Sequence, residues 1–291
     1  MPRPLKLGKR SRRIPAHAPR SAVVTGAAGG IGKAIAQRLI ARGYAVLVTD
    51  VDADRATMTA KEIGAADGCG YDVTDEGEAA AIAARARAHA PLGAWVCNAG
   101  VGFDGAVADQ GSKRIRTLVD VNLLGVIWGV RAAVTVMREQ ARDGIKGGDI
   151  AMTASLSAHG PVPGLSVYAA TKAAVLSLAT SMDSELRKDR IRVHAVCPDG
   201  VDTGLLDVMD PQGQGLSLIR SGGRLLQADE VAAAVEAMLG TRRVYRTLPV
   251  RRGLVMRATS MFPAALMSFE PLLRRQGARA TRARHQSDPR T

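Results

Sequence analysis

Three polar side chains in the middle of the chain have the types and spacing that proton transfer requires. Tyr168 and Lys172 stand four residues apart in a helical pattern, so both side chains project from one helix face. An ammonium near a phenol favours the phenolate, which lowers a tyrosine pKa from about 10 toward neutral pH. Ser155 follows an apolar strand and can hydrogen-bond the same substrate oxygen. The set predicts a general acid/base for an alcohol, although the Tyr and Lys alone would also suit a surface helix pair.

A glycine-rich turn near the start of the chain predicts an anion-binding element. Thr25-Gly-Ala-Ala-Gly-Gly-Ile-Gly32 joins an apolar strand to an amphipathic helix. Glycines let the backbone approach a pyrophosphate, and the helix N-terminus offers free N–H groups and a positive dipole end. Asp50 stands 18 residues later, where a carboxylate accepts both adenosine ribose hydroxyls and repels a 2′-phosphate. No basic residue occupies 27–29 or directly follows Asp50, so the pattern favours NAD over NADP.

These residues need a scaffold that brings them together, and the hydrophobic pattern predicts one. Strands are expected at 21–25, 45–50, near 70–71, and at 94–97, 149–153, 191–196 and 244–248. Helices are expected at 30–42, 53–63, 75–89, 164–188 and 229–239. Strands that alternate with helices predict an α/β fold, a Rossmann-like doubly wound parallel sheet with helices on both faces.

The net charge of +13, from 40 Lys+Arg against 27 Asp+Glu, invites a nucleic-acid partner. The charge is concentrated at the ends, because residues 1–20 carry +7 and residues 242–291 carry +10. Residues 21–241 therefore carry −4. Such terminal blocks are typical of solvated tails or interaction arms, and the nine aromatic residues offer no evident base-stacking platform. We expect no nucleic-acid partner.

The ends suggest three regions: a basic disordered leader over 1–19, a catalytic domain over 20–250 with a substrate lid at about 204–226, and a basic amphipathic extension over 251–291. The apolar segment 254–273 holds Arg257, Pro263 and Glu270, which a spanning helix would avoid. It suits a broken amphipathic segment that lies on a membrane, a partner or its own core.

Cysteine usage bears on the compartment. Cys69, Cys97 and Cys197 are too few for a disulfide framework, and no histidine lies at a metal-ligand spacing from them, so no metal site is expected. A reducing, cytoplasmic location is expected, with peripheral membrane contact through 254–273 as an alternative.

The order of these motifs resembles the compact one-domain branch of the short-chain dehydrogenase/reductase family, over about residues 20–250. The matching motifs are Thr25-Gly-x-x-x-Gly-Ile-Gly32, Asp72-Val73, Asn98-Ala-Gly100, Asn122 within Val-Asn-Leu, Ser155, and Tyr168-x-x-x-Lys172. The resemblance implies that Tyr168 is the general acid/base and that Lys172 lowers its pKa and holds the nicotinamide ribose. It implies that Ser155 orients the carbonyl and that Asn122 supports a water chain to solvent.

The same resemblance implies which residues bind the cofactor: Gly26, Gly30, Ile31, Gly32, Asp50, Asp72, Val73, Asn98, Ala99, Gly100, Tyr168, Lys172, Pro198, Val201 and Thr203. Three positions depart from the family pattern. Ala28 replaces a frequent Ser or Arg, and Cys97 replaces a frequent Asn. Asp199 replaces the glycine of the usual Pro-Gly-x-Val-x-Thr loop, which puts the tilt of that loop in doubt.

The expected function is that of an NAD-dependent oxidoreductase that interconverts a secondary alcohol and a ketone. The apolar, Met-bearing lid suggests a lipophilic substrate, although the same residues could pack on the fold or on a partner subunit. The alternatives are an NADP-dependent reductase of the same family, and a membrane- or nucleic-acid-associated binding protein that retains the fold. The family often forms homodimers or homotetramers, here through helices at about 103–140 and 164–188.

Overall fold

The computed structural model describes residues 19–207, 209–210, 213–262, 268, 271–272 and 274–276. Seven parallel strands form one sheet in the order β3-β2-β1-β4-β5-β6-β7. The chain crosses from one half of the sheet to the other between β3 and β4, which confirms the predicted doubly wound α/β fold. The strands are β1 (Ser21–Thr25), β2 (Ala45–Asp50), β3 (Asp67–Gly70), β4 (Leu92–Cys97), β5 (Gly148–Thr153), β6 (Ile191–Pro198) and β7 (Tyr245–Leu248).

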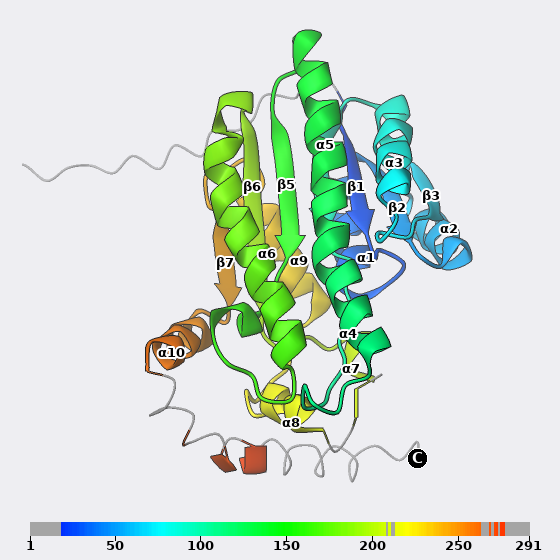
Figure 1. The fold of residues 1–291 in the computed structure, drawn as a ribbon. Coiled ribbons are helices and arrows are strands. Elements are labelled where there is room, and N and C mark those ends of the chain that lie inside the picture. Colours follow the sequence, from blue (N-terminus) through cyan, green and yellow to red (C-terminus); the bar gives the residue numbers. More distant parts are fainter. Residues whose placement is uncertain are drawn as a thin grey trace, which may run out of the picture.

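Helices cover both faces of the sheet (Figure 1). One face packs against α3 (Glu76–His89), α5 (Gly125–Arg142) and α6 (Ser166–Glu185). The other face packs against α1 (Gly30–Ala41), α2 (Ala53–Ile63) and α9 (Ala228–Met238). Because both faces are covered, every residue of β1 and β4 is buried, which explains why these strands show no alternation of apolar and charged residues.

The longest helical stretch contains a change of helix type. It consists of α4 (Ser112–Val119), a π-helical turn η1 (Asp120–Leu124) and α5. In the described part of the chain, this stretch is the one helix long and apolar enough to cross a membrane by length and composition. Its apolar residues Val126, Val130 and Ala133 lie in the core, so its composition reflects burial against the sheet.

Several short elements lie at the carboxyl end of the sheet. The predicted lid region contains α7 (Gly204–Asp207) and α8 (Gln214–Arg220). A 3-10 turn, η2 (Leu156–His159), follows β5 at this end, whereas a second, η3 (Arg187–Asp189), precedes β6 at the opposite end. After β7 the chain enters α10 (Val250–Met261), the first part of the predicted extension. The division into leader, domain and extension stays a prediction, and almost all of the leader lies outside the described residues.

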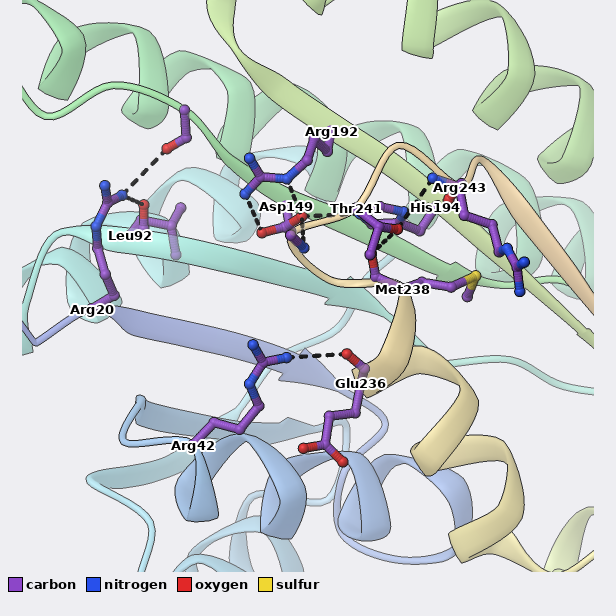
Figure 2. Close-up of polar contacts among 12 residues, drawn as sticks. Arg20, Arg42, Leu92, Asp149, Arg192, His194, Glu236, Met238, Thr241 and Arg243 are labelled. Carbon is purple, nitrogen blue, oxygen red and sulfur yellow. Dashed lines mark hydrogen bonds and ion pairs between the residues drawn. The ribbon is translucent and has the colours of Figure 1, made fainter. Parts of the chain in front are cut away.

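A buried polar cluster closes the opposite end of the sheet (Figure 2). The carboxylate of Asp149, at the start of β5, accepts two hydrogen bonds of 2.7 Å from Arg192 and one of 2.9 Å from His194. It also accepts one of 2.9 Å from the backbone N–H of Gly240. His194 is fully buried, and its other ring nitrogen lies 2.7 Å from the carbonyl of Arg243. The cluster ties the turn between α9 and β7 to the strand ends.

Candidate active site

The catalytic candidates gather at the carboxyl ends of the central strands. Ser155 follows β5 and caps η2, where its hydroxyl accepts a 3.2 Å hydrogen bond from the N–H of Ser157. Tyr168 and Lys172 project from the first turns of α6, as their spacing predicts. The side chain of Ser155 lies close enough to the phenol of Tyr168 to oppose the rise of its pKa. Strand β5 and helix α6 therefore bring the serine and the phenol together across the 12 intervening positions.

The ammonium of Lys172 is held inside the protein beside Tyr168. Its Nζ donates a 2.9 Å hydrogen bond to the carbonyl of Thr153 and lies 5.7 Å from the centre of the Tyr168 ring. The residue is 4% exposed, and burial lowers its pKa to about 8, opposed by the nearby thiols of Cys197 and Cys97. A buried cation with one protein acceptor has further N–H groups that a bound ligand can use.

The phenol of Tyr168 differs from the prediction made from its spacing. Burial raises its pKa, and the interaction with Ser155 only opposes that rise. The expected lowering by Lys172 is not found, and the lysine ammonium donates to the carbonyl of Thr153. Tyr168 therefore keeps its proton at neutral pH in this structure, which is the form that a general acid needs.

Asn122 lies in the π turn between α4 and α5 and is fully buried. Its amide pairs with the backbone of Val101 in both directions, since Oδ1 accepts from the N–H and Nδ2 donates to the carbonyl, each at 2.9 Å. Nδ2 also lies 3.4 Å from the hydroxyl of Thr171. A Cβ placed on Gly100 would meet Asn122 Oδ1 at 3.2 Å and Lys172 Nζ at 3.3 Å. Asn122 thus fixes the loop after β4 beside the lysine.

The glycine loop is shaped for a ligand to approach its backbone. Gly26 and Gly30 have left-handed φ values of +62° and +52°, which other residues rarely adopt. A Cβ on Gly32 would lie 2.3 Å from the carbonyl oxygen of Gly26, so α1 can pack this closely only with glycine there. Among the described residues, no side chain caps α1 at Gly29. Its first N–H groups, beginning near Ile31, are available to a pyrophosphate.

Asp50 lies at the carboxyl end of β2, beside this loop. Its carboxylate accepts hydrogen bonds from the N–H groups of Ala28 at 3.2 Å and Asp52 at 3.3 Å. A Cβ placed on Gly29 would lie 3.6 Å from the guanidinium of Arg55. The prediction from the sequence considered only 27–29 and the position after Asp50, and it missed Arg55, which lies five positions after Asp50 in the first turn of α2.

Asn98 joins the tips of three strands. Its Nδ2 donates to the carbonyls of Thr25 and Gly26, each at 3.1 Å, and its Oδ1 accepts from the hydroxyl of Thr153 at 3.1 Å. The N–H of Ala99 donates to the Thr25 hydroxyl at 3.0 Å. This motif therefore holds the glycine loop against the strands that precede Ser155 and Lys172.

The loop after β6 reaches the glycine loop from the other side. A Cβ on Gly30 would meet Thr203 at 3.3 Å, and Val201 forms an isolated bridge with Leu226 of the lid region. Pro198 ends β6. The predicted contacts of Pro198, Val201 and Thr203 with the nicotinamide stay a prediction.

Asp72 and Val73 follow β3. The carboxylate of Asp72 accepts hydrogen bonds from the N–H and hydroxyl of Thr74, at 2.9 and 2.8 Å. The side chain of Val73 packs against Gly125. A Cβ added to Gly125 would lie 2.8 Å from the Val73 side chain, so only glycine leaves this space. Both residues thus have local structural partners, and their predicted contact with adenine stays a prediction.

Asp199 has a partner that sequence reasoning missed. Its carboxylate lies 2.5 Å from the guanidinium of Arg252 in α10. The neighbouring Gly222 leaves the space that the Arg252 side chain fills. The same helix reaches the catalytic loop, because Ser260 donates a hydrogen bond to the carbonyl of His159 in η2. The sequence shows Asp199 as a departure from the family pattern. It does not predict the partner, because Arg252 lies in a different element, far away in the sequence.

An apolar cluster extends from the predicted lid to Tyr168. The buried members are Leu165, Leu206, Met209, Leu216 and Leu225, and Tyr168, Val162 and Ile219 pack against them. Asp104, in the loop after β4, accepts hydrogen bonds from the N–H groups of Gly215 and Leu216, at 3.1 and 2.9 Å. The carboxylate holds α8 over the site.

The arrangement defines a class: a Rossmann-type oxidoreductase with a Ser, Tyr and Lys site at the sheet's carboxyl edge. The family model described as short chain dehydrogenase matches residues 20–213, and the chain belongs to the short-chain dehydrogenase family. The uncapped α1, the two left-handed glycines and Asp50 fit a nicotinamide dinucleotide. Within the described residues, no group of three or more His, Cys, Asp or Glu is placed to hold a metal.

Similar proteins share this architecture. The chain is 33% identical over 224 residues to 2-dehydro-3-deoxy-L-rhamnonate dehydrogenase (NAD(+)) of Sphingomonas sp. strain SKA58, covering 75% of this chain and 87% of that protein. It is 31% identical over 215 residues to the probable oxidoreductase EphD of Mycobacterium tuberculosis, which is 72% of this chain but only 36% of EphD.

A short chain dehydrogenase/reductase of Burkholderia phymatum in complex with NAD superposes with a TM-score of 0.73 and 27% identity, over 82% of this chain and 92% of that one. The relatives also include an NADP-dependent (R)-specific alcohol dehydrogenase. The two cofactors therefore both occur among proteins similar to this chain.

Proposed function

We propose that the protein is an NAD-dependent oxidoreductase that interconverts a secondary alcohol and a ketone with apolar substituents. The observation that carries the proposal is the placement of Ser155 and Lys172 around the phenol of Tyr168: the serine side chain favours the phenolate, and the lysine ammonium lies 5.7 Å from the ring centre. A hydroxyl and a phenol on neighbouring elements can both reach one substrate oxygen.

The roles of the side chains follow from this geometry. In the reduction direction, Ser155 donates a hydrogen bond to the carbonyl oxygen, and Tyr168 gives its phenolic proton to that oxygen as the alcohol forms. A bound nicotinamide supplies the hydride. Lys172, with N–H groups beyond its bond to Thr153, holds a ligand hydroxyl and stabilises the negative charge left on the phenol. Asn122 keeps the loop after β4 in place beside it.

The apolar substrate class is supported by what lies around Tyr168. The lid cluster that includes Leu206, Met209 and Leu216 packs toward the phenol. Apolar side chains gain by excluding water with an apolar ligand, and methionine adapts to irregular shapes. NAD is supported by Asp50, whose carboxylate lies at the end of β2 beside the glycine loop.

Tyr168→Phe tests the mechanism. The variant retains the ring and loses the proton donor, so we expect turnover to fall by about 1,000-fold while NADH binding changes little. Turnover is followed by NADH absorbance with a panel of lipophilic alcohols and ketones, and binding by quenching of protein fluorescence. Tyr44→Phe is the matched control, because it removes a phenolic hydroxyl at the opposite end of the sheet. Wild-type turnover in the Tyr168 variant would overturn the assignment.

The expected homo-oligomer and the cytoplasmic location remain proposals alongside this function. Sedimentation velocity of the full chain measures the first, and fractionation of cells that express it measures the second.

A further inference from the structure

Helix α10 exposes its apolar face instead of burying it. On a helix with 100° between residues, one side of α10 holds Val250, Arg251, Leu254, Val255, Ala258 and Met261, and Phe262 directly follows the helix; all of these residues are exposed. The five large apolar side chains in this set are 61–72% exposed. An amphipathic helix normally turns such a face inward, and a contiguous exposed apolar patch marks an interaction site.

The opposite side of α10 is attached firmly to the protein. Arg252 pairs with Asp199, and Ser260 bonds the carbonyl of His159. Gly253 packs so closely on Thr247 that a Cβ would lie 2.6 Å from its methyl group. The guanidinium of Arg257 stacks 4.9 Å from the centre of the Tyr245 ring. These contacts fix which side faces outward, so the exposed face is a defined surface.

The charge around this face indicates what kind of partner it fits. Helix α10 contains three arginines and no acidic residue, and Arg251 lies on the exposed face itself. A second copy of the chain would bring the same cations against each other, which is unfavourable. Nucleic acid would satisfy the arginines and leave the apolar side chains in water. An anionic lipid surface satisfies both, because arginines pair with headgroups while the apolar face enters the acyl boundary.

The position of the helix relates this surface to the site. Strand β7 ends at Leu248, and α10 begins two residues later, at the end of the sheet where the lid helices α7 and α8 lie (Figure 1). We propose that the outer face of α10 binds an anionic membrane surface and docks the active-site end of the protein on the lipid. A substrate with apolar substituents would then reach the lid from the bilayer; this last step rests on the proposed function, whereas the docking does not.

Vesicle flotation of the full chain tests the docking. We expect binding to vesicles of 70% phosphatidylcholine and 30% phosphatidylglycerol at low salt, and at least about 10-fold weaker binding to phosphatidylcholine alone. The variant Leu254→Ser/Met261→Ser/Phe262→Ser keeps every charge, including those of the basic leader. A loss of vesicle binding in this variant therefore reports the loss of apolar insertion only. We expect about 100-fold weaker binding to the anionic vesicles.

Matched variants distinguish binding through this surface from non-specific binding of the protein to vesicles. Met58→Ser/Val107→Ser removes exposed apolar groups elsewhere and should leave binding unchanged. Arg251→Glu should weaken binding more than Arg142→Glu, which makes the same net charge change at the far end of α5. Repeating the flotation with Tyr168→Phe, which should bind normally, separates docking from turnover.

The proposal would be overturned by either of two results. One is a wild-type chain that does not float with anionic vesicles at low salt. The other is a triple serine variant that floats like wild type, or that changes only the oligomeric state in light scattering, which would assign the face to a second copy of the chain.

Discussion

The carboxylate of Asp199 lies 2.5 Å from the guanidinium of Arg252, and this ion pair joins the loop after β6 to helix α10. Asp199 lies between Pro198 and Val201, two positions predicted to bind the cofactor. Burial raises the pKa of Asp199, and the Arg252 cation opposes that rise. The charged residue at a position that the family usually gives to glycine therefore has a specific structural partner.

Removing the partner of this carboxylate should destabilise both the fold and the cofactor loop. For Arg252→Met we expect a loss of about 2 kcal/mol in the free energy of unfolding, because the buried Asp199 carboxylate is left without its cation. We also expect a higher KM for NADH. Urea unfolding and initial rates measure the two effects. Arg251→Met, at an exposed neighbouring position, is the matched control.

A double variant makes this prediction sharper. Asp199→Asn in the Arg252→Met background removes the uncompensated charge and should recover most of the lost stability. If the two single effects simply add, the pair does not contribute as a unit and the structural role of Asp199 is wrong.

Cofactor choice should depend on Asp50 and Arg55 together. We expect Asp50→Ala to lower kcat/KM for NAD by about 10- to 100-fold, because charged hydrogen bonds to the ribose hydroxyls are lost. The same change should raise kcat/KM for NADP, since the repulsion of a 2′-phosphate disappears and the guanidinium of Arg55 lies near Gly29. Steady-state kinetics with both cofactors measure the preference.

Two further variants complete this test. Arg55→Ala in the Asp50→Ala background should abolish the gain with NADP, and Asp54→Ala, an exposed carboxylate on the same helix, should leave the preference unchanged. A wild-type protein that already prefers NADP would contradict the role given to Asp50.

The Asp149 cluster should make stability depend on pH in the acid range. Burial would raise the pKa of Asp149, but the hydrogen bonds from Arg192 and His194 outweigh it and lower the pKa to about 2. The ordinary value is 3.8, so the folded state favours the carboxylate. The stabilisation, about 2 kcal/mol, is therefore fully present above about pH 4 and is lost as pH falls through about 2.

Asp149→Asn measures this contribution. At pH 7 we expect a lower free energy of urea unfolding than in the wild type, and the difference should shrink as the pH is lowered from 4 toward 2. Asp109→Asn removes an exposed carboxylate and should change little. A difference between wild type and Asp149→Asn that stays constant from pH 7 to 2 would show that the carboxylate charge is not what stabilises the cluster.

The sequence predicted the parts of this protein whose signals are local. The alternation of strands and helices, the glycines at 26, 30 and 32, and the four-residue spacing of Tyr168 and Lys172 each depend on neighbouring residues. The parallel sheet then collects such residues at one edge, because its strands all end there.

Contacts between distant elements could not be predicted in this way. The hydrophobic period across 112–142 is that of a helix, and it does not mark the π turn that carries Asn122. Arg252 looks like one more arginine in a basic tail until α10 is placed against Asp199. The effect of burial on the pKa of Tyr168 likewise depends on the lid, whose apolar residues have no fixed spacing from the tyrosine.

The reactivity of the three cysteine thiols can be used to measure local opening of the sheet. Cys69, Cys97 and Cys197 lie on β3, β4 and β6, and all three are buried and free. A thiol-specific reagent can reach them only when the sheet separates from its covering helices, so the labelling rate of each cysteine measures how often its part of the sheet opens. Because Cys97 and Cys197 flank Lys172, slower labelling on addition of cofactor would report directly that the catalytic edge has become more rigid.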